Sequence, residues 1–81
     1  MGDTKHIPDK SIDLVGTGCP MNMVYVKVEL AKMDSGQLLE VILDDGAPIR
    51  NVSKSIEREG HELVQKDQLA DGNWSVVIRK D

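Results

Sequence analysis

The side chain in this sequence best suited to covalent chemistry is a single thiol, that of Cys19. It lies in the run 16–22, Gly-Thr-Gly-Cys-Pro-Met-Asn, where the glycines favour a turn and Pro20 suits the first position of a helix. The start of a helix offers unpartnered amides, here those of residues 21–23, and the positive end of the helix dipole. Both favour a thiolate, which is the nucleophilic form, and Gly18 leaves room beside the sulfur. An inert cysteine that merely begins a helix is the alternative, which spacing alone leaves open.

Other chemistry-bearing residues are few. His6, His61 and Cys19 lack the spacing of a zinc site, so neither a metal nor a cofactor is predicted. With one cysteine, the chain has neither an internal disulfide nor a dithiol couple, and a reducing compartment is expected. Asp44 and Asp45 precede a glycine, and we interpret them as turn residues rather than as an acid–base pair.

Composition narrows the classes of partner. The 81 residues predict a single domain over residues 11–81 with a polar lead-in over residues 1–10. A net charge of −4, without a basic patch interleaved with aromatic residues, argues against nucleic acid. No apolar run approaches the roughly 20 residues that span a bilayer, and the N-terminal residues lack a signal-peptide core. We therefore expect a cytoplasmic protein, and a monomer, because the sequence shows no spare apolar surface.

Apolar periodicity predicts six elements. Strands are expected at residues 11–15, 37–43, 63–64 and 74–78, with a helix from Pro48 to Gly60 and a hairpin turn at 70–73. The segment 24–30 is ambiguous, because its valines alternate as in a strand while residues 23, 26, 30 and 33 follow helical spacing. We interpret it as a helix, since the stretch from Pro20 to Asp34 is long for a strand.

The order β-α-β-α-β-β predicts an α/β two-layer sandwich, with two helices packed on one face of a mixed four-stranded sheet. The first β-α-β unit should make a right-handed crossover between parallel strands. If those strands are parallel, both helix starts lie at one end of the sheet, where ligands tend to bind. Cys19 and Asn22 would then share this end with Asp44, Asp45, Arg50 and Asn51. Residues 71–73 join them if the third strand is parallel too. Arg50 would be the nearest cation able to steady a thiolate or persulfide, and an Arg50 that simply points into water is the alternative.

Several segments together resemble the TusA/SirA sulfur-carrier family. They are residues 13–20 (Asp-Leu-Val-Gly-Thr-Gly-Cys-Pro), 36–41 (Gly-Gln-Leu-Leu-Glu-Val), 44–47 (Asp-Asp-Gly-Ala) and 60–61 (Gly-His). The similarity runs from about Ser11 to the C-terminus, and the family's helix after its Cys-Pro agrees with the helical interpretation. The family hallmark is Cys-Pro-x-Pro, and Asn22 stands here at the second proline. Val15 replaces the family's usual basic residue. Residue 22 is expected in the first helical turn, where its amide has no intrahelical acceptor.

The resemblance implies a carrier rather than a free-standing enzyme. The family cysteine accepts sulfane sulfur from a cysteine desulfurase or rhodanese-like donor, holds it as a persulfide and passes it to an acceptor protein. In this chain that residue is Cys19, with Gly18, Pro20, Asn22 and Arg50 in support. Asn22 and Val15 leave open a non-catalytic interaction or regulatory module of the same fold. A redox-sensing thiol is the third interpretation.

Overall fold

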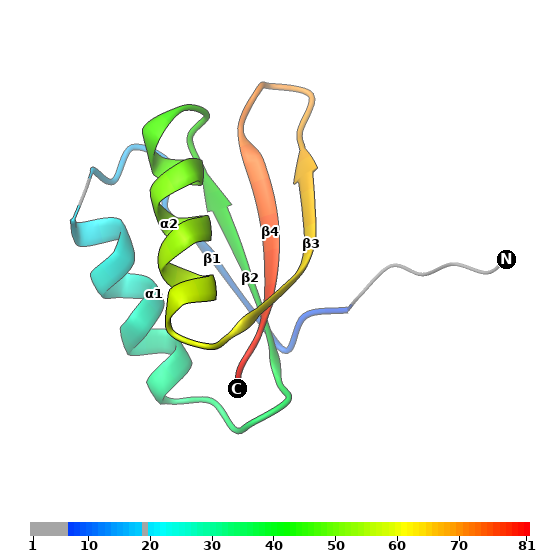
Figure 1. Cartoon of the computed structure of the whole chain (residues 1–81). Coiled ribbons are helices and arrows are strands. Elements are labelled where there is room, and N and C mark those ends of the chain that lie inside the picture. The colour runs from blue at the N-terminus through cyan, green and yellow to red at the C-terminus, as the bar shows by residue number, and fades with distance from the viewer. Residues whose placement is uncertain (1–6, 19) are drawn as a thin grey trace, which may run out of the picture.

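The computed structural model describes residues 7–18 and 20–81, which fold into two helices and four strands (Figure 1). In chain order these elements are β1 (Lys10–Asp13), α1 (Met21–Ala31), β2 (Leu38–Leu43), α2 (Ala47–Arg58), β3 (Glu62–Gln68) and β4 (Trp74–Arg79). The element order predicted from the sequence is confirmed, and residues 24–30 are helical as expected.

The four strands form one mixed sheet in the order β1-β2-β4-β3. β1 and β2 are parallel, whereas β4 runs antiparallel to both of its neighbours, β2 and β3. β1, β2 and β3 therefore run in one direction, and their carboxyl ends lie at the same edge of the sheet. Both helices cover one face of this sheet (Figure 1), so the predicted two-layer α/β sandwich is confirmed.

The alternating valines of α1 lie in a helix because that helix still delivers a buried stripe to the core. Val26 and Leu30, one turn apart, are buried, whereas Val24 and Val28 lie on the outer side and are 43% and 45% exposed. Pro20 stands directly before the first helical residue, one position earlier than the sequence predicts. The apparent strand pattern thus reflects two apolar sides of one helix.

α2 is amphipathic and has well-defined ends. Pro48 lies in its first turn, and its buried face consists of Ile49, Val52 and Ile56. At the other end the His61 N–H donates to the Ile56 carbonyl and the Gly60 N–H to the Glu57 carbonyl, both at 3.1 Å. This pairing is a Schellman motif, which requires the positive φ of +91° that Gly60 adopts readily.

The core between helices and sheet is aliphatic, as the absence of Phe from the sequence requires. Its fully buried apolar side chains are Val26, Leu39, Val41, Leu43, Val52, Ile56, Val76 and Ile78. Trp74 packs against the margin of this cluster at the start of β4. Both helices and the two central strands therefore contribute to a single core.

The first strand differs in its bounds from the sequence prediction. It spans residues 10–13 rather than 11–15. Leu14 keeps one further bond to the sheet, from its N–H to the Ile42 carbonyl at 2.9 Å. The Val15 N–H instead donates to Asp13 Oδ1 at 2.9 Å, because a short acidic side chain can capture an amide two residues on and turn the chain.

Candidate functional site at the carboxyl end of the sheet

Three loops meet at the edge of the sheet where β1, β2 and β3 end, and we call this edge the rim. They are the β1–α1 loop (residues 14–20), the β2–α2 loop (44–46) and the β3–β4 turn (69–73). The Gly16 N–H donates to Asp44 Oδ2 at 2.9 Å, and the Trp74 Nε1–H donates to Asp45 Oδ1 at 2.8 Å. The rim predicted from the sequence therefore exists among the described residues. Cys19 itself lies outside them.

The β1–α1 loop is compact on both sides of residue 19. Before it, the Thr17 N–H donates to the Leu14 carbonyl at 3.0 Å, and Gly16 turns the chain with a φ of +85°. After it, Pro20 directly precedes α1. Both sequence neighbours of the cysteine, Gly18 and Pro20, are exposed. The described residues on either side of residue 19 thus lie at the protein surface between β1 and α1.

The amides at the start of α1 are more fully used than the sequence analysis expects. The Asn22 N–H donates to the Gly18 carbonyl at 3.1 Å, and the Met23 N–H is shared between Asn22 Oδ1 at 2.6 Å and the Pro20 carbonyl at 3.1 Å. Residue 22 does lie in the first turn, but the expectation that its amide lacks an acceptor is wrong. The chain already closes a helical turn from residue 18 to residue 22. The helix dipole remains as a source of positive potential at this loop.

The side chain of Asn22 is fully buried although its sequence position is next to an exposed loop. Its Oδ1 accepts from the Met23 amide, while its Nδ2 has no hydrogen-bond partner within the described chain. A buried polar group without a partner costs about 1–3 kcal/mol. The residue that replaces the family's second proline is therefore an internal donor with unused capacity.

Arg50 lies in the first turn of α2, at the same end of the sheet as the rim. Its amide donates to the Gly46 carbonyl at 3.2 Å, and its side chain is exposed. Across the part of the chain that the structure describes, the Arg50 guanidinium makes no ion pair. This position agrees with the predicted rim and equally with a side chain that points into water.

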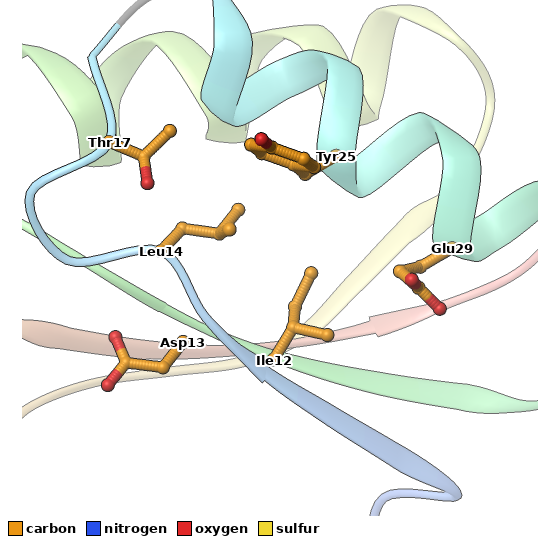
Figure 2. Close-up of a pocket in the computed structure, with 6 residues that line it drawn as sticks. All are labelled: Ile12, Asp13, Leu14, Thr17, Tyr25 and Glu29. Carbon is orange, nitrogen blue, oxygen red and sulfur yellow. The ribbon is translucent and has the colours of Figure 1, made fainter.

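A shallow pocket opens between β1 and α1, beside the β1–α1 loop (Figure 2). Its lining residues are Ile12, Asp13, Leu14, Thr17, Tyr25 and Glu29. Figure 2 shows the Tyr25 ring facing Leu14 across the pocket, with Thr17 at the end nearer the start of α1. Thr17 precedes Cys19 by two residues, so the pocket adjoins the loop that carries the thiol.

The outer side of α1 and the adjoining loop form an exposed apolar surface, which we call the α1 outer face. It consists of Val15, Met21, Val24, Tyr25 and Val28, each between 41 and 48% exposed. This surface was not predicted from the sequence, which led us to expect no spare apolar area. The signal was present, because residues 21, 24, 25 and 28 follow the i, i+3, i+4, i+7 spacing of a second apolar stripe.

The charged side chains that flank the α1 outer face are paired. Lys27 Nζ lies 2.7 Å from Glu59 Oε2, which links α1 to α2. Glu29 Oε1 lies 2.6 Å from Lys10 Nζ, and Glu29 Oε2 lies 3.8 Å from Lys32 Nζ. The hydrogen bond from Lys10 lowers the pKa of the Glu29 carboxyl below its ordinary value of 4.5, against the opposing effect of burial. The face itself therefore presents little net charge.

Residues 7–18 and 20–81 contain neither a cluster of metal ligands nor a helix able to span a membrane. No group of three or more His, Cys, Asp or Glu side chains in this part of the chain could hold a metal ion. None of the described helices is long and apolar enough to cross a membrane. His6, which the sequence analysis considered as a ligand, lies outside the described residues.

The fold and the rim together define a small α/β domain in which a single-cysteine loop joins the first strand to the first helix. The family model described as Sulfurtransferase TusA matches residues 10–80. The chain belongs to this TusA family, as the resemblance in the sequence predicts.

Known proteins similar to the chain span nearly all of it. "Sulfur carrier protein TusA" of Pseudomonas putida strain W619 is 32% identical over 77 residues, which cover 95% of each chain. A protein of Archaeoglobus fulgidus is 36% identical over 69 residues, 85% of this chain and 78% of its own. The crystal structure of a SirA-like protein from Desulfitobacterium hafniense superimposes with a TM-score of 0.77 at 25% identity, covering 86% of this chain and 95% of that one.

Proposed function

We propose that the protein is a sulfur carrier that accepts sulfane sulfur on Cys19 and delivers it to an acceptor protein. The observation that supports this proposal is that the loop between β1 and α1, which contains the only cysteine of the sequence, is exposed at Gly18 and Pro20 in a chain of the TusA family. Relatives named sulfur carrier proteins support the same role. The protein acts as a carrier rather than as a free-standing enzyme.

The transfer consists of two balanced displacement steps. The Cys19 thiolate attacks the outer sulfur of a persulfide on the donor protein, a new S–S bond forms, and the donor's inner sulfur leaves as a thiolate. A thiolate on the acceptor then attacks the outer sulfur of the Cys19 persulfide, and the Cys19 thiolate is released. Neither step needs an external oxidant, and both depend on an accessible thiolate. We propose the cytoplasm as the compartment, because a reducing environment keeps the single thiol free.

The partners of this relay are a cysteine desulfurase or rhodanese-like donor and an acceptor protein, and we propose that they contact the α1 outer face. Three observations support this. The face adjoins the Cys19 loop through Val15 and Met21, its flanking charges are paired, and α1 is apolar on two sides although one of them faces water.

The size of this face favours short-lived contacts. A stable interface takes about 800 Å² from each partner, and five half-exposed side chains supply only part of that area. A contact that forms and dissolves quickly suits a carrier that must visit two proteins in turn. We therefore keep the monomer as the proposed state, although the argument first made for it, that no apolar surface is spare, is wrong.

Mass spectrometry of protein isolated without reductant tests the proposal. We expect an adduct of one sulfur atom on Cys19 after incubation with a cysteine desulfurase and cysteine, and its loss on treatment with reductant. The Cys19→Ser variant is the matched control and should take up no sulfur. Oxygen adducts in place of sulfur would favour a redox sensor, and an unreactive thiol would favour a non-catalytic module.

A further inference from the structure

Two adjacent aspartates after β2 hold two different parts of the rim. Asp44 Oδ2 accepts a hydrogen bond from the Gly16 amide at 2.9 Å, and Asp45 Oδ1 accepts one from Trp74 Nε1–H at 2.8 Å. From the sequence, both residues are expected to be turn formers only. In the structure each carboxylate instead reaches a separate neighbouring segment, so that substitutions of the two residues should have different consequences.

The hydrogen bond from Gly16 to Asp44 differs from the other hydrogen bonds of the β1–α1 turn because it links the turn to a segment distant in the sequence. The Val15 amide donates to Asp13 and the Thr17 amide to Leu14, so both bonds are local. Asp44 lies 28 residues away from Gly16 in the sequence. Among the described residues it is the side chain from another element that holds the apex of this turn. A bond between a backbone amide and a carboxylate is charge-assisted and stronger than a neutral one.

We propose that Asp44 is a positioning residue for Cys19, an inference that rests on the proposed sulfur-carrier function. By fixing Gly16, three residues before the cysteine, the carboxylate limits the orientations of the loop that presents the sulfur to a partner. A reacting group held in the attacking geometry gains rate, and loss of that geometry can cost up to about 100-fold. The Asp44 charge works in the opposite direction, since a nearby anion disfavours a thiolate. The hydrogen bond between Gly16 and Asp44 is thus present in spite of the unfavourable effect of the Asp44 charge on the thiolate.

Three variants separate the effect of the hydrogen bond to Gly16 from the effect of the Asp44 charge. Asp44→Asn removes the charge and keeps an oxygen acceptor for the Gly16 amide. Asp44→Ala removes both. Asp45→Ala is the matched control, because it removes the same charge from the neighbouring position and releases Trp74 instead of the loop. Trp74 fluorescence should change in Asp45→Ala and stay unchanged in Asp44→Ala, and circular dichroism checks that every variant is folded.

Two readouts are measured on the full chain. The first is the pH dependence of Cys19 alkylation by iodoacetamide, and the second is the rate of sulfur uptake from a cysteine desulfurase. For Asp44→Asn we expect an alkylation midpoint below that of wild type and uptake within about threefold of it. For Asp44→Ala we expect a midpoint above that of Asp44→Asn, and uptake at least about tenfold slower than in Asp45→Ala.

The outcomes distinguish this inference from the proposed function. Equal uptake rates and equal alkylation profiles for Asp44→Ala and Asp45→Ala would overturn the positioning role while leaving the carrier role intact. A wild-type protein that takes up no sulfur would overturn the carrier role. In that case the alkylation midpoints of Asp44→Ala and Asp44→Asn still decide whether Asp44 positions the thiol, because removal of the charge alone would shift both midpoints equally and only loss of the bond to Gly16 separates them.

Discussion

At the scale of single residues, the site is defined by how Asn22 differs from proline. Its side chain is buried, its amide donates to Gly18, and its Nδ2 is left without a partner in the described chain. A proline at this position would lose the bond from the residue 22 amide to Gly18 and would remove one unsatisfied donor, while the Met23 amide, which loses Asn22 Oδ1, keeps the Pro20 carbonyl as its acceptor. These two effects are of similar size, about 0.5–1.5 kcal/mol for the bond and about 1–3 kcal/mol for the donor, and they oppose each other.

We therefore expect Asn22→Pro to change the free energy of unfolding by no more than about 1.5 kcal/mol. The exposed Gly18 carbonyl, which loses the amide donor, can turn to water. Urea titration measures the change, with Asn22→Ala as the control that keeps the amide and removes the side chain. A loss of about 3 kcal/mol or more, the cost of proline inside a helix, would contradict this account. We also expect the substitution to alter the preference among sulfur donors.

Sequence reasoning located the thiol loop but not its hydrogen bonds. Gly16, Cys19 and Pro20 were identifiable because glycine, a lone cysteine and proline each have strong local preferences. The partner of the Gly16 amide was not, because Asp44 is distant in the sequence and reaches the loop only once β1 and β2 pair. The burial of Asn22 was also hidden, since a polar side chain beside a surface loop is usually exposed.

At the scale of elements, α1 is held by ion pairs on its flanks, and one of them is sensitive to pH. Lys10 lowers the pKa of Glu29, so the folded state holds this proton less tightly than the unfolded state does. The resulting stabilisation is present above the ordinary pKa of 4.5 and is lost as the pH falls through the lowered value. The pair joins β1 to α1 on either side of the Cys19 loop.

For Glu29→Gln we expect a lower melting temperature than for wild type at neutral pH. The difference should shrink as the pH falls below about 4.5 and close once the Glu29 carboxyl is protonated in both states. Thermal melts across pH measure this, and added salt should narrow the gap because Lys10 is partly exposed. A melting difference that stays constant from neutral to acidic pH would argue against the ion pair as its cause.

The α1 outer face gives a second prediction at this scale. Val28→Lys places a charge at the C-terminal end of the face, and we expect sulfur uptake from a cysteine desulfurase to fall. Stability should stay within about 0.5 kcal/mol, because Val28 is exposed and lysine is a good helix former. Ser35→Lys, which adds the same charge to an exposed turn after α1, is the matched control. Equal uptake by the two variants would remove the α1 outer face from the proposed contact.

The elements themselves were largely predictable because their ends carry strong signals. Pro48 and Gly60 bracket α2, and Pro20 precedes α1, so the helices could be placed from the sequence. The outer face of α1 was missed because its valines were assigned either to a strand or to the core. A pattern of apolar residues records where hydrophobic side chains recur, but not whether a second layer of protein covers them.

At the scale of the whole molecule, one aliphatic core supports every loop of the rim. β2 lies between β1 and β4 and contributes Leu39, Val41 and Leu43 to that core, all without exposed surface. The β1–α1 and β2–α2 loops leave this sheet at one edge and are tied to each other through Gly16 and Asp44. The position of the rim therefore depends on the parallel pairing of β1 with β2, which the sequence order alone predicted.

A domain of this length has a small reserve of stability, about 4–12 kcal/mol at roughly 0.05–0.15 kcal/mol per residue. Leu39 is fully buried in the central strand β2, so we expect Leu39→Ala to cost about 2–5 kcal/mol. That loss is a large fraction of the total and should move the urea midpoint far downward. Val24→Ala, on the exposed side of α1, is the control and should stay within about 0.5 kcal/mol of wild type. Comparable losses for the two variants would mean that the side of α1 described as exposed is covered in solution, by a second copy of the chain. The midpoint of wild type would then rise with protein concentration, which the same titrations measure directly.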